Sequence, residues 1–228
     1  WNYSGFERRP LWEAFSAVNR HLAGGVSDPR VVFEHSPAHN AAGSIRAFES
    51  LPLFSGRSTL EGLYVQSSLN SPSIFYLQSE LSEVASCPFP DYHCARLDLA
   101  RAAEHLRRYN AGQVVARSAT LKAALRDSPE FSLEAEFPPY EVHRVRGNAG
   151  RYVVPLDLEP VLLTGGDWKR DFYRWLKRPD ADGVVLAWSG DGEDRRRGDF
   201  RLAADRLPER APRGALPADG VVVEEEIE

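Results

Sequence analysis

Apolar residues recur at intervals of three and four positions in several segments of the chain, a pattern typical of amphipathic helices. One such segment begins at Leu11 and is followed by Gly24 and Gly25, which stop a helix. In another, Ser71 before Pro72 is the expected N-cap and first turn. The pattern predicts helices over residues 11–23, 71–86, 97–110, 119–127 and 167–179, and a shorter one over 46–54 that stops near Pro52.

Short apolar and β-branched runs lie between these helices and are typical of strands. Strands and helices alternate along most of the chain, and this order predicts an α/β fold with a largely parallel sheet covered by helices. The arginines of the third long helix are expected on its solvent face. The predicted strands cover residues 31–33, 58–66, 113–117, 131–137, 140–146 and 184–188.

The RGNAG segment at Arg146–Gly150 has the composition of a linker or a long hairpin loop. We therefore divide the chain into an α/β soluble domain over residues 1–146 and a second part over residues 151–228. The second part is a strand-rich C-terminal extension with one amphipathic helix. The chain begins abruptly with WNYSGFERRP and ends abruptly with VVVEEEIE, so we expect a longer protein cut at both ends, with the second part truncated.

The segment 43–70 mixes charged and amide side chains with many large apolar ones. An exposed loop does not need so many leucines and phenylalanines, and a plain core segment does not need two arginines, two glutamates and a run of amides and hydroxyls. We expect this segment to form a partly buried surface lined by polar groups. Its candidate ligand-binding residues are Arg46, Glu49, Arg57, Glu61, Tyr64, Gln66 and Asn70.

A second candidate region follows the first predicted strand, because α/β proteins place ligand sites in loops at the ends of central strands. This loop carries the candidates Glu34, His35, His39 and Asn40. Pro37 disfavours the helix that would bring the two histidines onto one face. Hydrogen bonding within the loop is the favoured role of the histidines, and ligand binding, metal binding or acid–base chemistry is the alternative.

Composition excludes several classes of protein. The formal net charge of −5 argues against a general nucleic-acid binder, and no run approaches the roughly 18 apolar residues that cross a bilayer. The sequence has no GxGxxG, GxxxxGK[ST], HExxH or GxSxG motif and no zinc-ligand pattern, so we predict no cofactor and no metal.

Cys87 and Cys94 form a disulfide if the compartment is oxidising and are free thiols if it is not.

Several segments together resemble a known family. They are VVFEHSPAHN, SIRAFESLPLFSGRSTLEGLYVQSS, SIFYLQSELS, FPPYEVHRV and YVVPLDLEPVLL. The resemblance is to the 6-pyruvoyl-tetrahydropterin synthase related domain of polytopic bacterial and archaeal membrane proteins, which are similar in layout to integral-membrane glycosyltransferases that use polyprenyl-phosphate sugars. It covers most of residues 1–159 and is strongest over 46–68.

The resemblance implies a place for the domain and not an activity. True pterin synthases resemble a zinc enzyme with a His-x-His pair, which this sequence does not contain. The catalytic carboxylates of the glycosyltransferase relatives lie in loops of the membrane part, outside this chain. The resemblance implies a soluble module attached to its own transmembrane region, on the extracytoplasmic face of the cytoplasmic membrane, where Cys87 and Cys94 can form a disulfide.

Three functional hypotheses follow. The favoured one is a non-catalytic extracytoplasmic module of a membrane-embedded glycosyltransferase-like protein, which helps to bind a glycan or a lipid-linked sugar. The first alternative is a hydrolase or transferase domain that uses Glu61 or Glu34 with His35 or His39. The second alternative is a structural module that only packs against its own transmembrane bundle. The binding hypothesis predicts that the charged and amide residues of segment 43–70 line one cleft at the strand ends.

Overall fold

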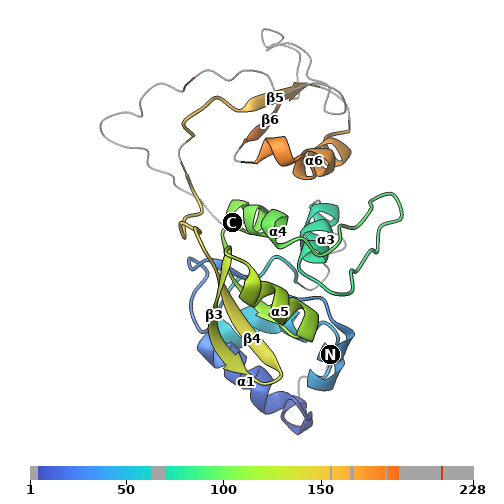
Figure 1. Cartoon of the computed structure of the whole chain (residues 1–228), viewed down its shortest axis with the longest axis vertical. Coiled ribbons are helices and arrows are strands. Elements are labelled where there is room, and N and C mark those ends of the chain that lie inside the picture. The colour runs from blue at the N-terminus through green and yellow to red at the C-terminus, as the bar shows by residue number, and fades with distance from the viewer. Residues whose placement is uncertain are drawn as a thin grey trace.

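A computed structural model describes residues 5–62, 70–154, 156–164, 167–182, 184–189 and 212. A four-stranded sheet and its covering helices make up the lower part of Figure 1, and a smaller unit of two strands and one helix lies above them. The helices are α1 (Trp12–His21), α2 (Leu51–Ser55), α3 (Ser71–Glu80), α4 (Leu99–Arg108), α5 (Ala119–Asp127) and α6 (Trp168–Leu176). Short 3-10 helices are η1 (Phe6–Arg8), η2 (Pro37–Ala42), η3 (Ala47–Ser50) and η5 (Pro179–Ala181).

The sheet is mixed, and the prediction of a largely parallel sheet was wrong. Its strand order is β1-β2-β4-β3, in which β1 and β2 are parallel and the other two pairs are antiparallel. The reason lies in the connection lengths: a two-residue turn at Pro138 and Pro139 joins β3 to β4, and a tight turn can join only antiparallel strands. The strands are β1 (Arg30–Phe33), β2 (Ala111–Ala116), β3 (Phe131–Phe137) and β4 (Tyr140–Val145).

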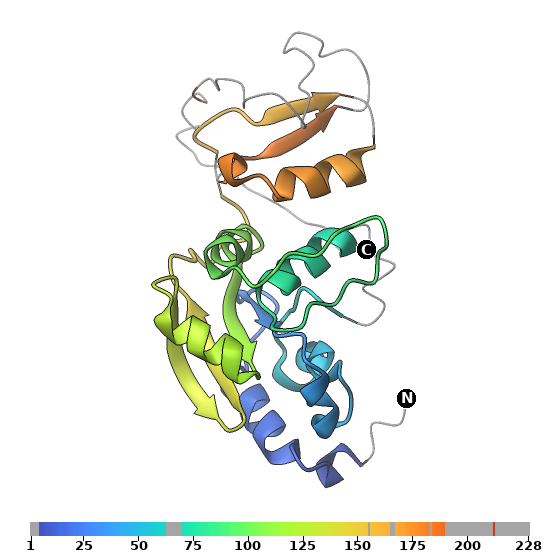
Figure 2. The same cartoon turned by 45° about the vertical axis from the view of Figure 1, so that its right-hand side comes forward.

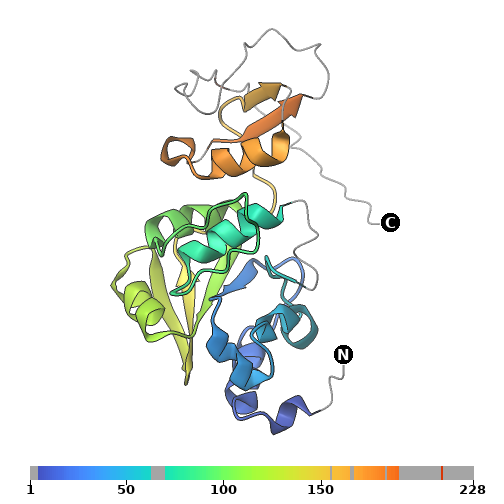
Figure 3. The ribbon, with the colours of Figure 1, turned by 90° about the vertical axis from the view of Figure 1, so that its right-hand side faces the viewer.

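Each face of the sheet packs against its own set of helices. Alternate residues of a strand point to opposite faces, and in β1 the side chains of Val31 and Phe33 join one buried cluster while Val32 joins the other. The first cluster includes side chains of α1, η3 and α2, and the second includes side chains of α3, α4 and α5. The sheet is therefore the central layer, as the turned views show (Figures 2 and 3).

Several predicted boundaries differ from the structure, and α3 ends at Glu80 instead of continuing to residue 86. Pro52 lies in the first turn of α2 and does not end a helix, because a proline at this position loses no intrahelical hydrogen bond. Asn70 occupies the N-cap position of α3, one residue before the expected Ser71. In the predicted strand 58–66, Thr59 forms an isolated parallel bridge with Val31, and residues 63–69 lie outside the described part of the chain.

The upper unit pairs β5 (Val161–Thr164) with β6 (Leu186–Ser189) in parallel, and α6 lies between them in sequence. In Figures 2 and 3, α6 also lies between this small sheet and the helices α3 and α4. Arg101 of α4 donates a hydrogen bond to the carbonyl oxygen of Leu176 at 3.0 Å, which ties the upper unit to the lower part. The division at residues 146–151 stays a prediction. In the part of the chain that the structure describes, no helix has both the length and the apolar character to cross a membrane.

Candidate functional site

A small pocket of about 140 Å³ lies at the C-terminal end of β1 and brings together four of the predicted site residues. Its polar lining comes from His35, Arg46, Glu49 and Glu61, which belong to three separate segments of the chain. The remaining lining residues are Phe33, Ile45, Phe75, Ser86 and Pro88.

The local structure explains why these side chains converge. His35 is the second residue after β1, and its backbone N–H donates to Ser82 Oγ at 2.9 Å, which fixes the strand end against the segment after α3. Glu49 lies on η3, and Arg46 occupies the N-cap position of the same short helix. Glu61 follows α2 within the segment that returns beside β1. The site therefore lies where a parallel strand ends, as expected for α/β folds.

Arg46 and Glu49 form an ion pair through Arg46 Nε and Glu49 Oε1. The carboxylate is almost fully buried, with 3% of its side chain exposed, whereas the arginine side chain is 34% exposed. Burial raises the pKa of Glu49, and the hydrogen bond and charge of Arg46 oppose that rise. Glu49 is thus a buried carboxyl group whose charged form depends on one arginine at the rim of the pocket.

Glu61 differs from Glu49 because it has no ion pair within the described residues. Burial, together with the nearby charge of Glu49, raises the pKa of Glu61 to about 8, although Arg46 lowers it in part. The Glu61 carboxyl therefore keeps its proton at neutral pH and can donate a hydrogen bond as well as accept one. Two carboxyl groups in different environments are a common arrangement for acid–base chemistry and for polar recognition.

Three polar atoms of this pocket are buried and make no hydrogen bond to the described residues. They are Glu49 Oε2, Glu61 Oε1 and His35 Nδ1. Burial also lowers the pKa of His35, so its imidazole is neutral at pH 7. An unsatisfied buried polar group costs about 1–3 kcal/mol, and a bound molecule that supplies hydrogen bonds would remove that cost. The pocket is therefore suited to a ligand with several hydrogen-bonding groups.

Arg57 lies away from this pocket, contrary to the prediction that it shares one cleft with Arg46. Its guanidinium is buried, and it donates to the carbonyl oxygen of Pro29 and, at 3.0 Å, to Gln113 Oε1. These contacts hold the turn before β1 against β2. Arg57 is a structural residue because its hydrogen-bonding groups serve the protein's own backbone and core.

Of the other candidate residues in the segment 43–70, Asn70 is described by the structure and lies outside the pocket. Asn70 Nδ2 donates to the hydroxyl oxygen of Tyr109 at 2.9 Å, and Asn70 does not line the pocket. Tyr64 and Gln66 lie outside the described residues. The candidate surface is thus supported by Arg46, Glu49 and Glu61, together with His35 from the preceding loop.

Glu34 and His39 are buried inside the fold. Glu34 Oε2 accepts hydrogen bonds from the backbone N–H groups of Arg117 and Ser118, both at 2.7 Å, and so secures the start of α5. His39 Nε2 lies 2.8 Å from the carbonyl oxygen of Glu34, and its ring stacks on Tyr140 with centroids 5.8 Å apart. Burial lowers the pKa of His39 to about 4. Of the carboxyl and histidine pairs considered from sequence, Glu61 with His35 is the pair that lines the pocket.

Residues distant in sequence complete the pocket wall, and the sequence carried no signal for them. Ser86 and Pro88 lie on either side of Cys87, which is joined to Cys94 by a disulfide with a Cα–Cα distance of 5.8 Å. Phe75 comes from α3. Among the residues that the structure describes, no group of three or more His, Cys, Asp or Glu side chains is arranged to hold a metal ion.

One family model matches the chain. It is described as a domain of unknown function (DUF8559) and matches residues 13–161. Comparisons with curated proteins and with solved structures found no match. The matched range contains the whole four-stranded sheet and all the residues that line the pocket at the end of β1. Because the match covers more than half of its 228 residues, the chain belongs to the DUF8559 family.

Proposed function

We propose that the pocket at the end of β1 binds a small, hydroxyl-rich ligand, the end of a glycan or of a lipid-linked sugar. The observation that carries the proposal is the convergence of Arg46, Glu49, Glu61 and His35 on one pocket, with buried unpartnered atoms on three of them. A sugar hydroxyl both donates and accepts hydrogen bonds, so neighbouring hydroxyls can satisfy a carboxylate, a protonated carboxyl group and a neutral imidazole together.

The dimensions of the pocket favour one end of a larger ligand. Whole small molecules usually occupy roughly 300–1,000 Å³, whereas this pocket measures about 140 Å³. Phe33 and Phe75 provide apolar wall for the C–H faces of a ring, and Arg46 at the rim is placed to contact a phosphate or further hydroxyl groups. A terminal sugar fits this combination.

The binding test uses the purified chain and calorimetric titration with a panel of mono- and disaccharides and sugar phosphates. Glu49→Gln and Glu61→Gln preserve side-chain shape and remove the carboxyl chemistry. We expect at least one sugar to bind. Glu49→Gln should weaken it roughly tenfold or more, since hydrogen bonds to charged groups are worth about 1.5–3 kcal/mol, and Glu61→Gln should weaken it about two- to tenfold, since hydrogen bonds of neutral groups are worth about 0.5–1.5 kcal/mol. Glu13→Gln, on the exposed face of α1, is the matched control. Sugar affinity that is unchanged in both pocket variants would overturn the proposal.

Acid–base catalysis is a second candidate for the same pocket, favoured by the Glu61 pKa of about 8 beside a neutral His35. A group with a pKa near the working pH is suited to donate and recover a proton. In this hydrolase or transferase function, Glu61 protonates a leaving group and His35 accepts a proton. Turnover of glycans or sugar phosphates by the purified chain, abolished by Glu61→Gln, would favour catalysis over binding alone.

We also propose the cellular setting implied by the family resemblance: an extracytoplasmic module of a membrane-embedded, glycosyltransferase-like protein. The bonded pair Cys87 and Cys94 supports this setting, because disulfides persist in oxidising compartments. The partner would then be the protein's own transmembrane region. Reporter fusions to the full-length gene product test the topology, and a reporter active only in the cytoplasm would contradict this setting.

A further inference from the structure

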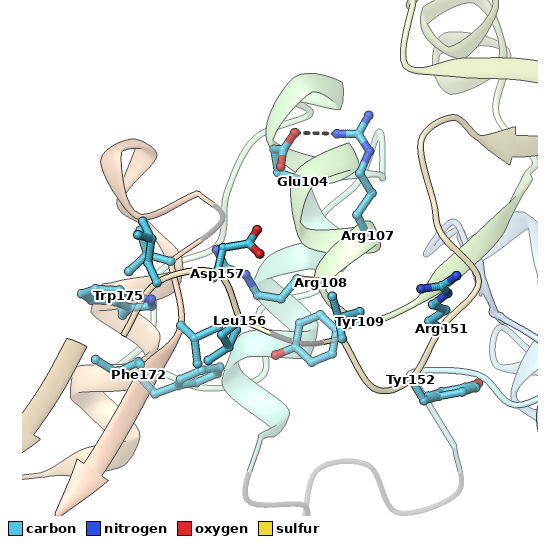
Figure 4. Close-up of a pocket in the computed structure, with 15 residues that line it drawn as sticks. Glu104, Arg107, Arg108, Tyr109, Arg151, Tyr152, Leu156, Asp157, Phe172 and Trp175 are labelled. Carbon is cyan, nitrogen blue, oxygen red and sulfur yellow. Dashed lines mark hydrogen bonds and ion pairs between the residues drawn. The ribbon is translucent and has the colours of Figure 1, made fainter. Parts of the chain in front are cut away.

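A second cavity, of about 660 Å³, lies between the end of α4 and the upper unit (Figure 4). Its walls come from Arg108 and Tyr109 at the end of α4, from α6 and from the start of β6. The connecting segment contributes Arg151, Tyr152, Val154, Leu156, Asp157 and Leu158. This volume is within the range of pockets for whole small molecules. No residue of the pocket at the end of β1 lines it, so the two sites are separate.

Arg108 gives the cavity a positive charge that the described residues leave without a direct counter-ion. Its guanidinium donates one hydrogen bond, to the carbonyl oxygen of Ala181 at 3.0 Å, and forms no ion pair within the described part of the chain. Among the charged groups near Arg108, Asp182 attracts its guanidinium most strongly, but the Asp182 carboxylate is already paired with Arg101. Burial lowers the pKa of Arg108, which reflects the cost of holding this charge away from water.

A second arginine lines the same cavity. Arg151 is exposed, and none of the described residues forms an ion pair or a side-chain hydrogen bond with it. Arg107 is different, because its guanidinium is paired with Glu104 and Glu130. Arg108 and Arg151 are therefore the two guanidinium groups of this lining that are available for an anion.

Aromatic side chains supply the rest of the recognition surface. Phe172 and Trp175 of α6 lie on one side of the cavity in Figure 4, and Tyr109 lies across from them. Trp175 is only 1% exposed, so the aromatic surface open to a ligand comes from the partly exposed Phe172 and Tyr109. Such surfaces favour a flat or ring-shaped apolar body. Asp157 also lines the cavity, and its carboxylate opposes the binding of an anion. The lining thus combines a partly buried cation, a rim cation, aromatic walls and one acidic group.

We propose that this cavity is a ligand site for an organic phosphate that carries an aromatic ring. The phosphate contacts Arg108, whose fork of N–H donors matches phosphate oxygens. Arg151 strengthens the attraction from the rim, and the ring lies against Phe172 and Tyr109. Because α6 forms one wall, the site requires both the sheet-containing part and the upper unit.

The test is calorimetric titration of the purified 228-residue chain with three probes: 1-naphthyl phosphate, 1-naphthol and inorganic phosphate. We expect the phosphate ester to bind about tenfold or more tightly than either part alone, since it uses both the arginines and the aromatic walls. Arg108→Gln and Arg151→Gln should each weaken it about fivefold or more, and Asp157→Asn should strengthen it. Arg174→Gln, an exposed arginine of α6 that does not line the cavity, is the matched control.

Two results would overturn this site: equal affinity for the phosphate ester and 1-naphthol, or unchanged affinity in both arginine variants. If Arg108→Gln does not fold, two variants at exposed positions test the site instead. Arg151→Gln should weaken binding of the phosphate ester, and Asp157→Asn should strengthen it. Glu61→Gln should leave naphthyl phosphate binding unchanged. Failure of sugar binding at the first pocket and failure of this site are therefore measured independently.

Discussion

Glu61 is held as a protonated carboxyl near neutral pH by burial beside Glu49. Its side chain has a folded-state pKa of about 8 against an ordinary value of 4.5, so the folded state binds the proton more tightly than the unfolded state. By linkage, its contribution to the free energy of unfolding is fully present below pH 4.5 and is lost as pH rises through 8. One buried carboxyl therefore makes the fold less stable in alkali.

The first prediction concerns this pH dependence. Glu61→Gln removes the titrating group and retains the side-chain shape, so the variant should gain stability relative to the original chain between pH 5.5 and 8.5. The difference in the free energy of unfolding between the two chains should rise by no more than about 1.4 kcal/mol for each pH unit. Urea denaturation of both chains at several pH values measures it, with Glu13→Gln as the control. A difference in the free energy of unfolding that does not change with pH would contradict the raised pKa of Glu61.

The second prediction separates the two arginines of the segment 43–70. Arg57→Met leaves the carbonyl oxygen of Pro29 and the amide of Gln113 without their donor, and should lower the free energy of unfolding by about 2–3 kcal/mol. Arg46→Met should lower it less, because the Arg46 side chain lies at the rim and a Glu49 carboxyl that loses this partner can take up a proton, yet it should weaken ligand binding. Urea denaturation and calorimetry distinguish these effects. Equal destabilisation by both substitutions would contradict the separate roles.

At the residue scale, the sequence predicted part of the candidate site. The mixture of charged and apolar residues correctly pointed to buried polar groups, and Arg46, Glu49 and Glu61 do line one pocket. The same pattern did not separate Arg57, because a buried arginine that binds backbone carbonyls has the same local sequence surroundings as one that lines a pocket. The contacts of Arg57 with Pro29 and Gln113 form only in the tertiary fold, so they could not be predicted from the local sequence.

At the element scale, the helices followed from apolar spacing, but the direction of the sheet did not. The apolar runs of β1, β2 and β4 look the same in sequence whether the neighbouring strands are parallel or antiparallel. The alternation of helices and strands therefore led to a wrong prediction of strand direction. The same limitation applies to α4. Its arginines were expected on a solvent face, whereas Arg101 and Arg108 bind backbone oxygens of the upper unit.

The third prediction concerns the contact between α4 and α6. His105 is fully buried, with Nδ1 2.6 Å from Glu80 Oε2 and Nε2 2.9 Å from the carbonyl oxygen of Leu176. His105→Leu leaves Glu80 buried without this partner and should lower the free energy of unfolding by about 3–5 kcal/mol. Faster hydrogen exchange in α6 should accompany the loss.

The double variant His105→Leu and Glu80→Leu is the control for this contact. It replaces both polar partners with apolar ones, so it should recover much of the stability lost by the single substitution. Urea denaturation of the three chains measures the recovery. A double variant less stable than the single one would show that Glu80 is not left unpaired by loss of His105.

At the scale of the whole molecule, the fourth prediction concerns the link between Cys87 and Cys94. The two residues enclose a short loop whose start forms part of the pocket wall. The chain purified from an oxidising compartment should not react with a maleimide until it is reduced, and should then take up two equivalents. Intact mass spectrometry measures the uptake, and labelling before reduction would contradict the disulfide.

Cys87 lies between two residues of the pocket wall, Ser86 and Pro88. Its disulfide bond to Cys94 therefore constrains the same segment that forms this wall. If the proposed extracytoplasmic setting holds, the disulfide would form after export and would fix this part of the pocket wall. The chain would then gain its full affinity for the proposed ligand only once Cys87 and Cys94 are joined.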